Sequence, residues 1–188
     1  MSLENLISFD PPPEMDISRL SAEDASSVII SGQQQAEVMR ALQEIYATPE
    51  GRAAIERAAG ASLDGKVHIM NNPGGITMAL GRGIVSNTIV FGSEDDNAKY
   101  LQPSTGQYAD LTIQRILYHE FHHMGHGHSM DNGQFNLRQE SETIAATNVF
   151  MAKYYGEPHR SLDHSAARFG GTEGHDFNRS YSGPTPVQ

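Results

Sequence analysis

The stretch YHEFHHMGHGH, residues 118–128, holds five of the nine histidines of the chain, with one glutamate among them. His119 and His123 lie four residues apart, about one turn of an α-helix, so both imidazoles can reach one metal ion. Glu120 lies about 100° further round such a helix, where its carboxylate reaches a water on the metal and not the metal itself. The HExxH pattern therefore predicts a zinc site with His119 and His123 as ligands and Glu120 as general base.

A catalytic zinc also requires a third protein ligand and an open fourth position. Continuation of the motif to HExxHxxGxxH would require glycine at position 126 and histidine at position 129, where the chain has His126 and Ser129. That pattern is therefore excluded. A version shifted by one residue would use His128, and it requires the helix to break sharply at Gly125 and fold back within three residues.

A glutamate on a following helix is the remaining candidate. The downstream stretch NLRQESETIAATNVFMAKYYG has apolar residues at helical spacing, and the predicted helix ends at Gly156. Glu140 and Glu142 lie in its first turns and point about 200° apart, so only one of them can face a metal.

The elements that must position these groups can be followed along the chain. Apolar residues at three- and four-residue steps predict an amphipathic helix that is capped by Asp110 and extends to about Gly125. Upstream, residues 33–47 predict a first helix. Thr48 as N-cap and Pro49 as first residue begin a second helix.

Segments with strand character lie between these helices. KVHIM, residues 66–70, is typical of a strand, in which His68 is an ordinary position. Ile76–Leu80 and Thr88–Phe91 predict a hairpin or a pair of strands, and Thr88–Phe91 could present an edge to an extended peptide. The polar residues 93–108 predict a loop. The order of elements predicts an α+β fold.

Composition restricts the class of protein. The chain has 188 residues, enough for one domain with a core, and we expect residues 1–27 to form a flexible tail before a domain over residues 28–188. The absence of cysteine excludes disulfides and thiolate zinc ligands. A net charge of −10 argues against a nucleic-acid partner. The sequence shows no apolar run typical of a membrane span, and its N-terminus is not typical of a Sec signal peptide.

Beyond these residues, the chain resembles a known family. ILYHEFHHMGHG followed by QESETIAATN is similar to the NleD-like bacterial effector zinc metallopeptidases, as is the upstream LQEIYATPEGRAAIERA. TEGHDFNRSYSG resembles their C-terminal Arg-x-Tyr segment, with Arg179 and Tyr181 at the matching positions. Gln139 replaces the first acid of the second motif and Ala145 replaces its glycine. The resemblance covers residues 33–181 in outline.

This resemblance implies a zincin-like metallopeptidase with Glu140 as third ligand and one Zn²⁺ per chain. The chain also resembles toxin domains of secreted bacterial proteins. It implies a virulence effector or toxin that leaves the cell by a non-Sec route and cleaves a protein inside a host or competitor cell. A secretion chaperone and an immunity protein are the partners implied.

The catalytic groups complete these expectations. Glu120 would accept the proton of the attacking water and pass it to the leaving amine. A protein donor would stabilise the oxyanion. Tyr181 is the candidate donor, with His126 or His128 as alternatives, while the role of His122 is unassigned.

Two other functions would use the same residues. A zinc amidase acting on peptidoglycan or on small amides has similar ligands and differs in substrate size. A non-enzymatic metal-binding module would close all four positions with protein ligands and would leave Glu120 without a chemical role.

Overall fold

The computed structural model describes residues 1–72, 78–80, 86–92, 99–126, 137–163 and 167–168. Within these residues the chain is a mixed α+β domain, as the sequence predicted. In chain order the elements are η1 (Leu3–Asn5), β1 (Ile7–Ser8), η2 (Ile17–Arg19), α1 (Ala22–Ser27), α2 (Gly32–Tyr46), α3 (Pro49–Gly60), β2 (Val67–Asn72), β3 (Met78–Leu80), β4 (Thr88–Gly92), β5 (Lys99–Gln102), β6 (Gln107–Asp110), α4 (Ile113–Gly125), α5 (Leu137–Tyr155) and β7 (Ala167–Arg168).

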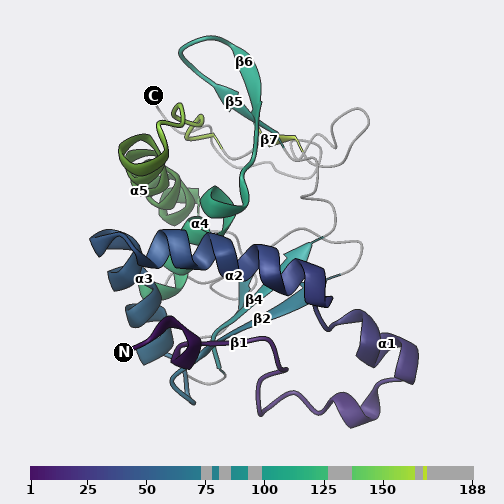
Figure 1. The fold of residues 1–188 in the computed structure, drawn as a ribbon. Coiled ribbons are helices and arrows are strands. Elements are labelled where there is room, and N and C mark those ends of the chain that lie inside the picture. Colours follow the sequence, from purple (N-terminus) through teal and green to yellow (C-terminus); the bar gives the residue numbers. More distant parts are fainter. Residues whose placement is uncertain (73–77, 81–85, 93–98, 127–136, 164–166, 169–188) are drawn as a thin grey trace.

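Two sheets are present in the described part of the chain. The first has the strand order β1-β2-β4-β3, in which β1, β2 and β4 are parallel and β3 runs antiparallel to β4. The second has the order β6-β5-β7 and is antiparallel. Figure 1 shows the β5–β6 hairpin projecting away from the first sheet, on the side where α4 begins.

The hydrophobic core lies between the first sheet and the helices. Apolar side chains of α2, α3, α4, α5, β2 and β4 form one cluster, in which α4 packs against α2, α3 and α5. Fully buried members come from each of these elements: Leu42, Ile45, Ile55, Ile69, Ile89, Leu117, Phe121 and Met151. The core therefore fixes α4, the helix that carries HExxH, on three sides.

The turn between α2 and α3 confirms the predicted helix start. Thr48 caps α3 by accepting a hydrogen bond from Gly51 N at 3.0 Å, and Pro49 is the first helical residue. A Cβ atom at Gly51 would lie 2.1 Å from the carbonyl oxygen of Ile45, so only glycine allows the two helices to approach this closely.

The N-terminus differs from the expected tail over residues 1–27. Leu3, Leu6 and Ile7 are buried in the core, and β1 pairs in parallel with β2. The prediction is therefore wrong for the start of the chain. The Pro-rich segment after these residues suggested disorder for the whole stretch. The apolar residues that precede it nevertheless pack into the core of the domain.

Two further expectations require correction. Thr88–Phe91 does not present a free edge, because β4 pairs with β2 on one side and with β3 on the other. Part of the predicted loop over residues 93–108 is the β5–β6 hairpin, whose turn contains Gly106 at a φ of 66°. The predicted pair of strands over Ile76–Leu80 and Thr88–Phe91 is confirmed for the described residues, because β3 pairs antiparallel with β4.

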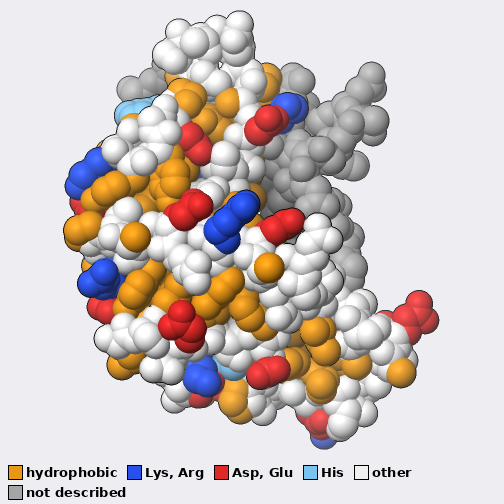
Figure 2. All heavy atoms as spheres, in the orientation of Figure 1, with side chains coloured by type: hydrophobic (Ala, Val, Ile, Leu, Met, Phe, Trp, Pro, Cys, Tyr) orange, Lys and Arg blue, Asp and Glu red, His pale blue; other side chains and the backbone are white. Residues whose placement is uncertain are grey.

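The described surface is mixed in charge. Figure 2 shows acidic and basic side chains interspersed over one face, with apolar side chains between them. Among the described helices, none is both long enough and apolar enough to cross a bilayer.

Candidate metal centre

Helix α4 has an apolar face and a polar face. Thr112 caps the helix by accepting a hydrogen bond from Arg115 N, so the cap is two residues later than the predicted Asp110, which ends β6. Arg115, His119 and His123 follow at four-residue steps and line the side that faces α5. This row of polar groups is the first half of the candidate site.

Helix α5 supplies the second half. Glu140, in its first turn, is buried with 3% exposure, although it is a carboxylate. Glu142 is exposed and pairs with Arg138 at 2.9 Å on the outer side of the helix. The helical phase thus separates the two glutamates as predicted, and Glu140 is the one directed at α4.

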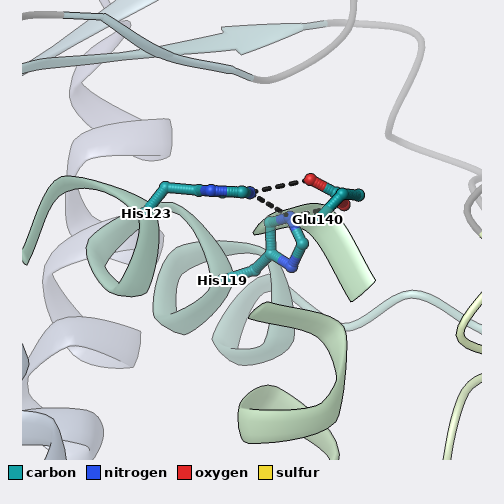
Figure 3. Close-up of side chains that lie close together, drawn as sticks. All are labelled: His119, His123 and Glu140. Atoms are coloured by element: carbon teal, nitrogen blue, oxygen red, sulfur yellow. Dashed lines mark hydrogen bonds and ion pairs between the residues drawn. The ribbon is translucent and has the colours of Figure 1, made fainter. Parts of the chain in front are cut away.

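The histidines and Glu140 converge closely (Figure 3). His119 Nε2 lies 3.1 Å from Glu140 Oε1, and His123 Nε2 lies 2.8 Å from Glu140 Oε2. The two Nε2 atoms are 3.1 Å apart. Ligand atoms on one tetrahedral zinc, each about 2.0–2.1 Å from the ion, are about 3.3 Å apart. The donor set and its spacing therefore fit a single metal ion, and this buried triad could hold one.

Thr143 lies behind the triad, one turn of α5 after Glu140. Its Oγ1 is 3.4 Å from His123 Nδ1 and 3.2 Å from His122 Nδ1. A hydrogen bond at Nδ1 fixes the orientation of a ligand histidine and leaves Nε2 for the metal. His122, which the sequence left unassigned, therefore belongs to the surroundings of the ligands.

Opposing effects act on the two histidines. Burial lowers the pKa of His119, and the Glu140 carboxylate only partly offsets this effect. Burial also acts to lower the pKa of His123, but the hydrogen bond to Glu140 and the negative charge of Glu120 outweigh it and raise that pKa. A histidine must be neutral to bind a cation, so of the two candidate histidine ligands His123 is the one at which a proton competes more strongly.

Glu120 occupies the position expected of a base. It is buried, with 8% exposure, and it lies outside the converging triad. Its negative charge nonetheless acts to raise the pKa of His123 and that of Arg160. Glu120 is thus close to the triad without being part of it, as the helical phase of HExxH requires.

Next to the triad, Arg115 of α4 and Asn148 of α5 belong to a hydrogen-bond network that sequence analysis did not identify. Asn148, two turns after Glu140 on α5, accepts a hydrogen bond from Arg115 Nη1 at 2.8 Å and one from Arg160 N at 2.7 Å. Arg115 also donates to Glu157 Oε2. The only sequence signal for this network was the position of Arg115, one turn before His119.

The other candidate donors do not join the triad in the described structure. His126 is exposed at the C-cap of α4, and its Nδ1 lies 3.0 Å from the carbonyl oxygen of His122. His128 and Tyr181 lie outside the described residues, so their predicted roles stay predictions.

Comparisons with known proteins give no independent identification. No protein-family model, no curated protein and no solved structure matches the chain.

Proposed function

We propose that this protein is a zinc-dependent endopeptidase. The observation that carries the proposal is the convergence of two histidines one turn apart with a buried glutamate from the adjoining helix, within 3.1 Å of one another. A histidine pair and one carboxylate are a common ligand set of catalytic zinc sites, because they leave the fourth position for water or substrate.

The chain supplies the remaining chemistry around that ion. When bound, zinc would polarise the substrate carbonyl and lower the pKa of its water to about 7. Glu120 is the base that takes the proton of the attacking water and transfers it to the leaving amine. Thr143 holds the His123 ring in place through its Nδ1 atom.

A zincin-like arrangement is part of the proposal. The order of two helices, a small sheet, the HExxH helix and a ligand-bearing helix supports it. The outer strand β3 supports it as well, because β3 lies at the end of the first sheet and contacts α4. An extended peptide could add to this strand and pass across the triad.

The resemblance to effector peptidases suggests where the enzyme would act. We propose a bacterial effector or toxin that is delivered into a host or competitor cell and cleaves a protein there. Incubation of the zinc-loaded protein with a target-cell lysate, followed by mapping of new peptide N-termini, would identify the substrate. New termini that depend on Glu120 would support a peptidase, whereas cleavage of peptidoglycan or of small amides alone would favour an amidase.

The most direct test combines metal analysis with Glu120→Gln. We expect about one zinc per chain in both the parent and the variant, because Glu120 is not a ligand, and turnover lower by about 10²–10⁴ in the variant. Glu142→Gln, which removes an exposed carboxylate on α5, is the matched control and should retain activity. An active Glu120→Gln protein, or a parent that binds no zinc, would contradict the proposed function.

A further inference from the structure

Arg160 is a buried cation with unused hydrogen-bonding groups. The residue follows α5, is 7% exposed, and neither its Nε nor its Nη2 atom has a hydrogen-bond partner among the described residues. Burial of a charged donor without a partner is costly. A second group is therefore expected to complete the site when it functions.

The backbone of Arg160 is held independently of its side chain. Arg160 N donates to Asn148 Oδ1 at 2.7 Å, and Asn148 Nδ2 donates to Arg160 O at 2.8 Å. This pair of bonds fixes where the side chain begins. The guanidinium is not needed to anchor the segment, so its retention in the interior calls for another reason.

A neighbouring arginine shows what a structural role looks like in this protein. Arg115, which is also buried, donates from all three side-chain nitrogens, to Glu157, Asn148 and Pro158 O, and it stacks over the Tyr100 ring at 4.6 Å. Arg160 lacks such partners at two of its nitrogens. The contrast points to a ligand outside the chain.

The location of Arg160 indicates which site that ligand would enter. The Arg160 backbone is bonded to Asn148, two turns after Glu140 on α5, and Asn148 is bonded in turn to Arg115, one turn before His119 on α4. The carboxylates of Glu140 and Glu120 accordingly act on the Arg160 charge, and Arg160 acts on His119. Asp163, an exposed residue, acts on it as well. The guanidinium charge thus interacts with the charged groups of the candidate metal centre, although the guanidinium forms no hydrogen bond with the triad.

The chemistry of the unused edge selects the ligand. Nε and Nη2 form one side of the guanidinium plane, and their parallel N–H groups match the two oxygens of a carboxylate. The charges agree: the two charges of a zinc ion would offset Glu120 and Glu140, which leaves the exposed Asp163 as the remaining carboxylate that acts on the Arg160 charge among the described residues.

We propose that Arg160 binds a carboxylate of the substrate close to the scissile bond. This inference deepens the proposed function and rests on it. The carboxylate comes from an Asp or Glu side chain, since an endopeptidase cleaves its substrate away from the chain ends; the free C-terminus, which presents the same pair of oxygens, is the alternative that the test excludes. Arg160 is thus a specificity-determining residue of a peptidase that selects acidic substrates.

The first test uses the peptide that brackets the cleavage site mapped in lysate. It is synthesised in its native form, with each acidic residue replaced by its amide, and with a free or an amidated C-terminus. Removal of the recognised carboxylate should lower kcat/KM of the parent by about 10–100-fold, the range for a lost charged hydrogen bond. Whichever substitution causes the loss identifies the source of the carboxylate.

The same peptides are then given to Arg160→Gln and Arg160→Lys. Arg160→Gln should cleave the acidic and amide forms at nearly equal rates. Arg160→Lys, which keeps the positive charge but lacks the two parallel N–H groups, should show an intermediate preference. Both should retain zinc. Arg138→Gln, which removes an exposed arginine of α5 that pairs with Glu142, is the matched control: it should leave the preference of the parent unchanged.

A binding measurement separates this inference from the proposed activity. Succinate is titrated into zinc-loaded protein by calorimetry, with succinamide as the neutral match. Arg160→Gln should weaken succinate binding by about tenfold or more. Equal succinate binding by parent and variant, or a parent enzyme indifferent to substrate carboxylates, would overturn the role of Arg160. An inactive parent that still binds succinate through Arg160 would instead count against the peptidase activity alone.

Discussion

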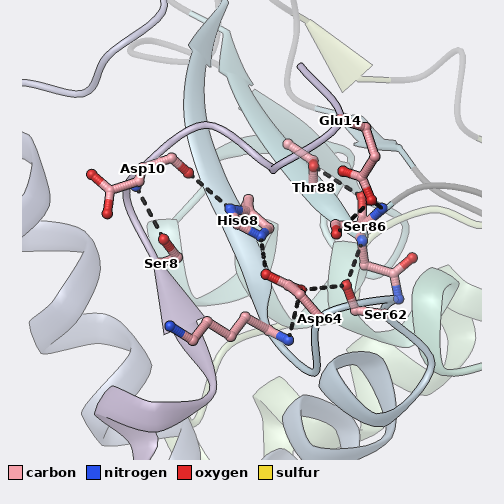
Figure 4. A network of polar contacts seen from close by, with 10 residues as sticks. Ser8, Asp10, Glu14, Ser62, Asp64, His68, Ser86 and Thr88 are labelled. Atoms are coloured by element: carbon pink, nitrogen blue, oxygen red, sulfur yellow. Dashed lines mark hydrogen bonds and ion pairs between the residues drawn. The ribbon is translucent and has the colours of Figure 1, made fainter. Parts of the chain in front are cut away.

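Two histidine–carboxylate clusters with buried histidine rings lie at different places in this protein. At the first sheet, His68 on β2 contacts the carbonyl oxygen of Asp10 at 2.8 Å through Nδ1 and Asp64 at 2.9 Å through Nε2 (Figure 4). Between α4 and α5, His119 and His123 direct their Nε2 atoms at Glu140 and at each other. The residue types are alike, but Asp64 is exposed whereas Glu140 is buried, and the directions of the ring nitrogens differ.

That difference separates a structural tether from a candidate metal site. Both ring nitrogens of His68 are occupied by protein acceptors from two other segments, so the ring joins the N-terminal segment to β2 and to the turn before it. Glu14 extends the tether by accepting from Ser86 N and Oγ. In the triad, two imidazole nitrogens and a carboxylate are directed towards a common centre, which is the geometry that binding of a cation requires.

The largest effect should follow from Glu140→Ala. The change removes one of three ligands and leaves two histidines, so we expect zinc content to fall well below one per chain and cleavage to be abolished. Metal analysis after dialysis and a peptide assay measure the two effects. Glu142→Ala, two residues later on the exposed face, should be mild in both. Zinc binding by Glu140→Ala at the level of the parent would disprove the ligand assignment.

A second substitution addresses the other cluster. His68→Ala removes two hydrogen bonds from a side chain that is 4% exposed, so we expect the free energy of unfolding to fall by about 2–3 kcal/mol with zinc content unchanged. Denaturant unfolding monitored by circular dichroism measures the loss. His159→Ala, at an exposed position, is the control and should be nearly neutral. Loss of zinc on His68→Ala would remove the distinction between the clusters.

The sequence predicted the triad because its information is local. A four-residue step places His119 and His123 on one face whatever the rest of the fold, and the opposite phases of Glu140 and Glu142 follow from helix geometry alone. Exposure of Glu142 and burial of Glu140 agree with that reasoning. The single long-range step, the approach of α5 to α4, was suggested by resemblance.

What the sequence did not predict depends on contacts between distant segments. Asn148 of α5 holds the backbone of Arg160 near the candidate metal centre, and no spacing rule relates the two residues. The tether at His68 likewise depends on Asp10, 58 residues earlier in the chain. The polar β5–β6 hairpin lacks the alternation by which strands are recognised, so its pairing was visible only in the structure.

A third prediction tests the surroundings of the triad. Thr143→Val keeps the shape of the side chain and removes the hydroxyl near His123 Nδ1, so zinc affinity should fall by about tenfold. Competition with a chromogenic chelator measures the affinity. Thr147→Val, one turn later, is the matched control: its buried Oγ1 has no hydrogen-bond partner among the described residues, so the change should be neutral or slightly stabilising. Equal affinities of the two variants would exclude a role for Thr143.

The smallest effect concerns a surface contact far from either cluster. Glu50 on α3 pairs with Lys153 and Tyr154 at the end of α5, and these partners lower the pKa of Glu50 from 4.5 to about 2. Because the folded-state pKa is depressed, the contact stabilises the protein fully above about pH 4.5 and is lost as the pH falls towards 2. Glu50→Gln should therefore reduce the difference in unfolding midpoint between pH 6 and pH 3, measured in urea. Glu37→Gln removes an exposed carboxylate whose partner is the neutral Gln33, and it should leave that difference as in the parent. An unchanged pH dependence in Glu50→Gln would mean that solvent screens the contact completely, as it does for many exposed ion pairs.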